Sequence, residues 1–480
     1  METKYVIFFL IFLIGVPVGA LACMAVPALS RWVMVALIWS TCEPNMLGIN
    51  FVSREFYRAN TRGFEVLATD LFALVLILFM LLKRKEYPLR LCPPLTVPTL
   101  LYLLVGFISW TQIGPSLPVP DEATVVPYAM FEIKLYPLFE LSKILRGFIL
   151  YLVIVNYVRD EKSARTVMLG IVVTALYMSW SAISSRYLYG VNRVRATLGH
   201  PNSLATYMAM LGIFTYALLL QSRKYLASIF YGAVTLLCGV SVILTISRGG
   251  LMAFALGVWV NTLAFFPRHL NAKNILLLAV GALLAMSVLF VAMDTLMTRF
   301  FSQQNASEDI AFRGRYNSEA KLMAREHTWG VGLGNFSAWS WVKYAKDVDP
   351  DMPPGTPAHN NWYLTLGEVG VPGVLALALL WLRYFGLAIP MYFRGRQDLL
   401  HTLAVASCTA VMADQLQSCL QLGYRQTPMY FMMMIFVGLT VAGWYARREA
   451  QPPAAGAGGT APTVPKPSTT GPTHTAEWTT

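Results

Sequence analysis

Apolar stretches approaching 20 residues recur along most of the chain, and they constrain the fold more than any other feature. A helix needs about 20 apolar residues to cross a bilayer, and a soluble fold has no reason to contain so many such stretches. We therefore predict an all-α integral membrane protein of about twelve transmembrane helices. They lie near residues 4–26, 65–82, 96–112, 144–158, 164–185, 203–220, 225–246, 250–266, 274–293, 361–383, 399–420 and 428–446.

The segment 26–42 is apolar as well, but Pro27, Ser30 and Arg31 interrupt it. We expect a short interfacial or re-entrant helix here, because a full span would reverse the orientation of the N-terminus. The first stretch, 4–26, exceeds the apolar region of a secretory signal peptide and has only Lys4 before it, so it is predicted to be the first span.

Composition agrees with a membrane protein and excludes other classes. Charged residues make up 13% of the 480 residues, against roughly 25% in soluble domains. The formal net charge is +12, but Lys and Arg are scattered through short loops without a basic amphipathic run, which argues against nucleic acid as a partner. The six cysteines contain no CxxC pair and indicate neither a metal site nor a disulfide framework.

Basic residues in the short loops predict the orientation. Under this assignment of spans they fall on one side, at residues 83–90, 159–165, 223–224, 268–273, 383–396 and 447–448. The positive-inside rule makes that side cytoplasmic, together with both termini. The chain then divides into spans 1–9 (residues 1–293), a large, partly helical periplasmic loop (294–360), spans 10–12 (361–446) and a disordered cytoplasmic tail (447–480). The connections around 113–143 and 186–202 also face outward.

The outward segments are nevertheless rich in arginine: Arg186, Arg193, Arg195, Arg248, Arg299, Arg313, Arg315 and Arg325. Orientation does not account for them, and basic side chains at the outer surface suggest an anionic ligand. The alternative is pairing with lipid headgroups or with the acids of the same loop, Glu308, Asp309, Glu319 and Glu326.

Two of these arginines stand in informative surroundings. Arg195 opens the sequence RATLGHPN, in which Pro201 and Asn202 predict the start of a helix, and a helix N-terminus favours anions. Arg248 lies in SRGG between two spans with almost no loop, where an arginine usually faces a cavity or a partner rather than lipid.

The outer loop supplies a candidate base. His359 lies in PAHNNWY immediately before the tenth span, and an imidazole there can accept a proton near neutral pH, although a lone interfacial histidine more often only caps or hydrogen-bonds. No HxxxH or HExxH pair is present, so a zinc site is not expected. Gly330, Gly332 and Gly334 do not form a dinucleotide-binding fingerprint and instead predict a tight turn returning the loop to the membrane.

In this order, Arg195 in RATLGHPN, Arg248 in SRGG, the FRGR segment running to GVGLGNF, and His359 in PAHNNWY, the residues resemble the bacterial O-antigen ligase and O-antigen polymerase superfamily. The resemblance covers about residues 193–390. It implies a GT-C-like glycosyltransferase that needs no metal or other cofactor and takes a glycan from an undecaprenyl pyrophosphate carrier at the periplasmic face of a bacterial inner membrane.

The resemblance also implies residue roles. His359 would be the general base on the acceptor hydroxyl, which attacks the anomeric carbon with inversion. Arg248 and Arg313 would neutralise the departing pyrophosphate, with Arg195 as a third contact. The family's loop arginine is commonly followed four residues later by Trp, whereas Asn317 and Glu319 stand at that offset from Arg313 and Arg315, so the choice between these two arginines stays open.

Three acceptors fit this chemistry: the lipid A core (a ligase), a second lipid-linked glycan (a polymerase), or a protein hydroxyl (an oligosaccharyltransferase). An anion transporter is the alternative from another class. A transporter would place charges near the membrane midplane, where Asp414 is the clearest candidate, and often shows internal repeats, which the sequence lacks.

Overall fold

The computed structural model describes residues 3–43, 48–53, 63–86, 88–114, 133–269, 303–349, 355–393 and 398–449, with isolated positions between 275 and 283. The first part contains α1 (Thr3–Leu10), the π-helical turn η1 (Ile11–Gly15), α2 (Val16–Ala25), α3 (Pro27–Ser40), the strands β1 (Gly48–Ser53) and β2 (Gly63–Leu67), α4 (Ala68–Leu82) and α5 (Thr96–Thr111). The middle part contains α6 (Tyr136–Tyr157), α7 (Glu161–Tyr187), the 3-10 turn η2 (Ala196–Leu198), α8 (Pro201–Gln221), α9 (Tyr225–Leu244) and α10 (Arg248–His269). The last part contains α13 (Gln303–Glu326), α14 (Phe336–Trp339), the π-helical turn η3 (Ser340–Tyr344), α15 (Ala345–Val348), α16 (Asn361–Phe393), α17 (Leu399–Ser418), the 3-10 turn η4 (Gly423–Arg425) and α18 (Thr427–Glu449).

Among the described helices, eight are long and apolar enough to span a bilayer: Tyr5–Ala25, Glu161–Tyr187, Pro201–Gln221, Tyr225–Leu244, Arg248–Phe265, Asn361–Phe393, Leu399–Ser418 and Thr427–Glu449. The chain is therefore a multi-pass, all-α membrane protein, as the apolar stretches predicted. The predicted ninth span, 274–293, lies almost entirely outside the described residues, and so do residues 115–132, 294–302 and the tail from residue 450. The total of about twelve spans stays a prediction.

The structure moves two predicted boundaries. The span expected at 144–158 belongs to α6, which begins at Tyr136, because its charged first turns pair inside the protein rather than facing lipid. The span expected from residue 65 begins at Ala68, where the side chain of Asp70 accepts a hydrogen bond from the backbone N–H of Leu67 at 2.8 Å. The residues before it form β2, which pairs antiparallel with β1 in a hairpin that hydropathy did not predict.

The segment 26–42 forms α3, which leaves α2 at Val26, where the backbone is not helical. Its 14 residues span about 21 Å, short of the ~30 Å hydrocarbon core. α3 packs against α4 and α7. This length agrees with the short helix predicted from the sequence.

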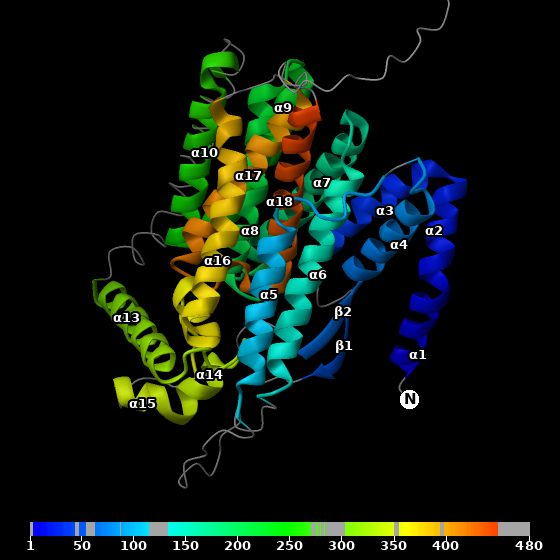
Figure 1. Cartoon of the computed structure of the whole chain (residues 1–480). Coiled ribbons are helices and arrows are strands. Elements are labelled where there is room, and N and C mark those ends of the chain that lie inside the picture. The colour runs from blue at the N-terminus through cyan, green and yellow to red at the C-terminus, as the bar shows by residue number, and fades with distance from the viewer. Residues whose placement is uncertain are drawn as a thin grey trace, which may run out of the picture.

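Helix α8 forms the centre of the bundle, and its apolar window is entirely buried. It packs against α9, α10 and α17, and α18 packs against both α17 and α6 (Figure 1). Glycines allow the close approach: a side chain at Gly257 would come within 2.2 Å of Ile213, and one at Gly212 within 2.7 Å of Phe254.

The helices alternate in direction, so the connections divide between two ends (Figure 1). At one end the basic loops meet: Arg90 pairs with Glu449 at 2.5 Å, and Arg159 donates to the backbone oxygen of Pro88 at 2.6 Å. Helices α13, α14 and α15 lie at the opposite end, which we call the α13 end. The basic loops at residues 83–90, 159–165 and 447–448 thus share one end, as the orientation argument requires.

Candidate functional site

Arg195 lies in the connection that leads into α8 at the α13 end. His200 caps the helix through its imidazole, which accepts from the N–H of Asn202 at 3.2 Å, and Pro201 occupies the first turn. This confirms the helix start predicted from Pro201 and Asn202. The Arg195 side chain is exposed and has no ion pair within the described part of the chain.

Arg248 is the first residue of α10, directly after a tight turn from α9. Ile246 in this turn has φ +54°, an unfavourable backbone conformation for a β-branched residue. A side chain at Gly250 would lie 2.4 Å from Cβ of Ala205, so glycine is needed where α10 crosses the start of α8. The turn is therefore held tightly, and the Arg248 side chain is half-buried beside it.

The Arg195 and Arg248 segments are joined by hydrogen bonds. The N–H of Val194 donates to the backbone oxygen of Leu244 at 3.3 Å. Arg193 donates to the backbone oxygen of Thr245 at 3.4 Å and to the side chain of Asn202 at 3.0 Å. Two motifs that are far apart in the sequence thus form one corner of the α13 end.

His359 lies directly before α16, and Asn360 fixes this position. The Asn360 carboxamide oxygen accepts from the N–H of Trp362 at 2.9 Å and of Tyr363 at 3.3 Å, and its nitrogen donates to the backbone oxygen of Cys419 at 2.9 Å. The half-buried His359 is therefore held beside the C-terminal end of α17.

The same end of α17 approaches the Arg248 turn. A side chain at Gly249 would come within 3.7 Å of Nε2 of Gln421 and 3.9 Å of Nε2 of Gln417. The end of α17 consequently adjoins both the histidine segment and the Arg248 turn.

Helix α13 brings the loop arginines to this site. Its Tyr316 ring packs edge-on against His359, with ring centroids 6.1 Å apart. Tyr316 also belongs to a buried apolar cluster with Ala320, Met323 and Leu364, which attaches α13 to α16. Arg313 and Arg315 lie on either side of Gly314, and Arg315 directly precedes Tyr316 in the sequence.

The structure distinguishes the two loop arginines. Arg315 pairs with Asp349 at 2.7 Å and stacks over Phe312 at 5.4 Å. Arg313 is half-buried and has no ion pair among the described residues. Arg315 therefore does pair with an acid of the outer loop, but the acid is Asp349 and not one of the four acids named from the sequence. Glu326 pairs with Lys343 instead, and Arg299 lies outside the described residues.

The glycine-rich segment after α13 forms the predicted tight turn. Gly330, Gly332 and Gly334 all have positive φ, at 74°, 96° and 77°. The N–H of Val331 donates to the oxygen of Gly367 at 3.0 Å, and that of Gly332 to the oxygen of Glu368 at 2.8 Å. The turn thus binds the backbone of α16 where Gly370, with φ 71°, interrupts that helix.

A buried acid lies next to these residues. Glu319, on α13, is fully buried, and burial raises the pKa of its carboxyl to about 7, although the nearby Ser340 hydroxyl opposes the shift. The hydroxyl of Ser340 accepts from the N–H of Gly355, at the start of the segment that leads to His359. Burial therefore favours the protonated form of Glu319.

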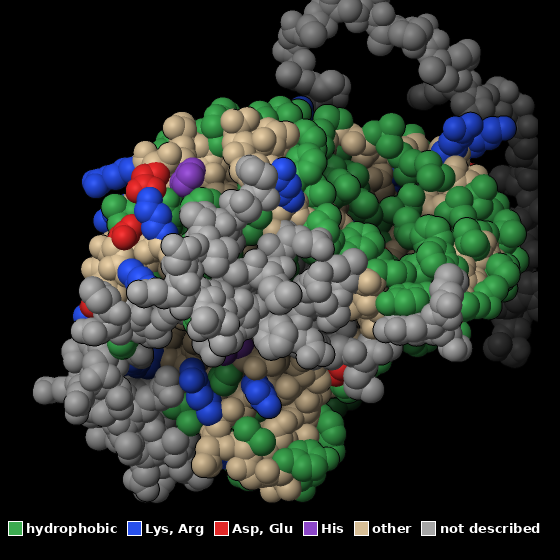
Figure 2. Space-filling model, turned by 90° about the horizontal axis from the view of Figure 1, so that it is seen from below, with side chains coloured by type: hydrophobic (Ala, Val, Ile, Leu, Met, Phe, Trp, Pro, Cys, Tyr) green, Lys and Arg blue, Asp and Glu red, His purple; other side chains and the backbone are tan. Residues whose placement is uncertain are grey.

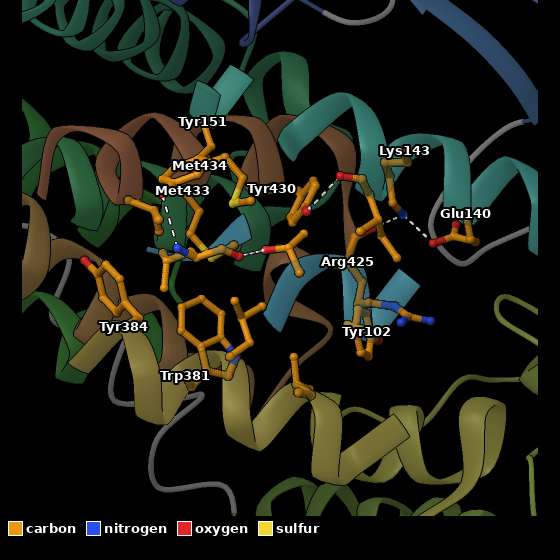
Figure 3. A pocket seen from close by; sticks show the side chains of 16 residues that line it. Tyr102, Glu140, Lys143, Tyr151, Trp381, Tyr384, Arg425, Tyr430, Met433 and Met434 are labelled. Carbon is orange, nitrogen blue, oxygen red and sulfur yellow. Dashed lines mark hydrogen bonds and ion pairs between the residues drawn. The ribbon is translucent and has the colours of Figure 1, made fainter. Parts of the chain in front are cut away.

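Sequence reasoning missed a buried ionic quartet formed by residues of α6, α16 and η4. Lys143 pairs with Glu140 at 2.5 Å and donates to the backbone oxygen of Arg425 at 2.6 Å, and Arg425 pairs with Glu368. Figure 3 shows Glu140, Lys143 and Arg425 at one side of a cavity whose lining is otherwise mainly aromatic and aliphatic. The spacing of Glu140 and Lys143, one helical turn apart beside an apolar stretch, was a signal that could have revealed it.

Figure 2 views the molecule from the α13 end, and more Lys and Arg than Asp and Glu side chains appear on this face. Within the described residues, no group of three or more His, Cys, Asp and Glu side chains is arranged to hold a metal ion. The site thus offers a histidine, several guanidinium groups and a set of polar side chains on α16 and α17.

Comparison with known protein families gives a match to the middle and later part of the chain. A family model described as O-Antigen ligase matches residues 233–378, a range that includes Arg248, Arg313, Arg315 and His359 but not Arg195. No curated protein matches the chain. This matched segment supports the resemblance of the chain to the O-antigen ligase and O-antigen polymerase superfamily.

Proposed function

We propose that this protein is a metal-independent, inverting glycosyltransferase that moves a glycan from an undecaprenyl pyrophosphate carrier to an acceptor hydroxyl. The family match supports membrane glycosyl transfer of the O-antigen ligase type. One observation supports the residue roles. At the α13 end, the His359 segment contacts both α13, which carries Arg313, and the end of α17, and the end of α17 contacts the Arg248 turn.

In this reaction His359 is the general base. The acceptor hydroxyl oxygen attacks the anomeric carbon from the face opposite the pyrophosphate, and its proton passes to the His359 imidazole. The bond from the anomeric carbon to the pyrophosphate oxygen breaks, and the bonding electron pair leaves with the pyrophosphate. The configuration at the anomeric carbon is therefore inverted.

The arginines neutralise the charge that develops on the pyrophosphate. Guanidinium groups bind phosphate oxygens through paired N–H donors and stay charged at all physiological pH values. Arg248 and Arg313 are the main contacts, with exposed Arg195 as a third. Arg315 already pairs with Asp349, so we assign it to holding the loop rather than to the pyrophosphate.

We place the protein in a bacterial inner membrane with the α13 end in the periplasm, because the basic loops lie at the other end. The acceptor is the lipid A core, a second lipid-linked glycan or a protein hydroxyl. All three need the same base and the same pyrophosphate contacts, so the residues named above do not distinguish between them.

The test is transfer in detergent with an undecaprenyl pyrophosphate-linked oligosaccharide, candidate acceptors and excess EDTA. Wild type should form product in EDTA, whereas His359→Ala should lose about 10²–10⁴-fold in rate, and Arg248→Ala should lose transfer strongly as well. A product ladder identifies a polymerase, and a single product identifies a ligase. Unchanged transfer by His359→Ala would contradict the base assignment, and no transfer by wild type with any acceptor would favour the anion transporter.

A further inference from the structure

Buried polar side chains without partners gather at the end of α17. Both polar atoms of the Gln417 carboxamide, both of the Asn361 carboxamide, the Ser418 hydroxyl and one carboxylate oxygen of Asp414 make no hydrogen bond within the described part of the chain. Each of these residues is at most 1% exposed. Leaving buried polar atoms unpaired costs free energy, so an occupant with hydrogen-bonding groups is expected here.

These side chains lie next to the proposed reaction site. Asp414, Gln417 and Ser418 have i, i+3, i+4 spacing, so they share one face of α17. Gln417 Nε2 approaches Gly249, the neighbour of Arg248: a side chain at Gly249 would lie 3.9 Å from that amide nitrogen. Asn361 follows Asn360, whose side chain binds the backbone of Cys419 at the same end of α17.

The chemistry of the unpaired atoms identifies the class of occupant. Carboxamides, a hydroxyl and a carboxylate together offer both donors and acceptors. Pyrophosphate oxygens only accept hydrogen bonds, so they would leave the amide oxygens and the Asp414 carboxylate unpaired. A sugar hydroxyl both donates and accepts, and it can satisfy both kinds of atom.

We propose that Gln417, Asn361 and Ser418, supported by Asp414, form a subsite that binds the hydroxyl groups of the sugar ring attached directly to the pyrophosphate. This inference rests on the proposed function, because Arg248 beside Gln417 is there a pyrophosphate contact. A sugar bonded to that pyrophosphate lies next to Gln417. The subsite therefore selects the first sugar of the donor.

The experiment compares wild type, Gln417→Leu and Asn361→Leu on undecaprenyl pyrophosphate carrying a single N-acetylglucosamine or its C4 epimer, N-acetylgalactosamine. Both substitutions remove the amide at similar side-chain size. Losing one or two hydrogen bonds should raise the KM for the preferred donor roughly tenfold and reduce the preference between epimers. Gln221→Leu is the matched control: Gln221 is the last residue of α8, at the end of the bundle away from the proposed site. This change should leave the KM and the preference between epimers unchanged.

Inhibition by undecaprenyl pyrophosphate without a sugar separates sugar binding from pyrophosphate binding. Gln417→Leu should leave this inhibition constant within about twofold of wild type, whereas Arg248→Ala should raise it about tenfold or more. Equal weakening of the bare and sugar-bearing lipids by Gln417→Leu overturns the proposal. So does an absence of any change, which would mean that only water occupies the site.

A binding readout keeps this inference separate from the transfer reaction. Thermal unfolding is measured with the sugar-bearing and with the bare lipid. A wild type that gains more stability from the sugar-bearing lipid, with the gain cancelled by Gln417→Leu and kept by Gln221→Leu, supports the subsite even where no transfer is detected. Equal stabilisation of wild type by both lipids overturns the subsite and leaves the transfer proposal to its own test.

Discussion

Basic side chains occupy two contrasting environments in this protein. In the ionic quartet, Lys143 and Arg425 are almost fully buried and each pairs with a carboxylate. At the α13 end, Arg195 and Arg313 are exposed or half-buried and pair with no acid among the described residues.

The difference separates structural cations from cations available to a ligand. A charge inside a membrane bundle is tolerated only when an opposite charge and hydrogen bonds compensate its lost hydration. An unpaired arginine at the rim stays hydrated, so it costs little to keep and can exchange water for phosphate oxygens. The comparison therefore predicts stability defects from the first set and functional defects from the second.

The largest expected effect comes from breaking the quartet. Arg425→Ala leaves Glu368 buried without its cation, which should lower the free energy of unfolding by about 3–5 kcal/mol. The thermal unfolding midpoint in detergent measures this loss. Arg195→Ala, the exposed counterpart, should leave the midpoint unchanged.

A double variant checks the cause. Arg425→Met combined with Glu368→Met removes both charges and should recover much of the lost stability, because no unpaired charge remains. If Arg425→Ala instead unfolds like wild type but loses glycosyl transfer, Arg425 belongs with the functional arginines, and the division between the two sets is wrong.

The next effect compares the two loop arginines. Arg313→Ala should lower kcat/KM for the lipid-linked donor about 10²-fold, equivalent to the 2–3 kcal/mol of a charged hydrogen-bond contact. Arg315→Ala should lower it by less than about tenfold, because this side chain forms a partly exposed ion pair with Asp349. The reverse order would show that the pair with Asp349 opens when the donor binds.

The sequence allowed the apolar helices and the positions of the motifs to be predicted. Helix α5 (Thr96–Thr111) lies almost where the stretch 96–112 placed it, because hydropathy depends on local sequence. The start of α8 at Pro201 followed from helix-start chemistry. The start of α6 was misplaced because its charges are buried by pairing, and pairing is not a local property.

The site was predictable only in part, for the same physical reason. Residue type and order indicated His359 and the arginines. The ring contact of His359 with Tyr316 and the ion pair of Arg315 with Asp349 depend on how distant segments pack. Gln417 gave no signal in an apolar helix, since only its lack of a hydrogen-bond partner in the folded chain distinguishes it.

Glu319 differs from the acids of the ionic quartet, because it is buried without a cation beside it among the described residues. Its burial therefore determines its pKa. Burial raises its pKa from 4.5 to about 7. The folded state therefore holds this proton more strongly than the unfolded state does. The resulting stability is fully present below the unfolded pKa and is lost as pH rises through about 7.

We expect the free energy of unfolding to fall by about 2 kcal/mol between pH 5 and pH 8 from this group alone. Glu319→Gln should reduce the fall, measured by the unfolding midpoint at both pH values. Glu326→Gln is the matched control: the Lys343 hydrogen bond lowers the pKa of Glu326, so its contribution has the opposite sign. An unchanged pH dependence in Glu319→Gln would mean that Glu319 is hydrated in the native protein.

The smallest expected effect concerns Asn360, which follows His359 and connects its segment to α16 and to the end of α17. Asn360→Ala removes the cap of α16 and should cost about 1 kcal/mol of stability, with a moderate loss of transfer because His359 is held less firmly. Asn360→Asp keeps the capping oxygen but loses the donor to the backbone of Cys419. If Asn360→Asp recovers stability but not transfer, the bond to α17 positions His359. If it recovers both, capping of α16 alone is sufficient, and the end of α17 contributes through its unpaired side chains only.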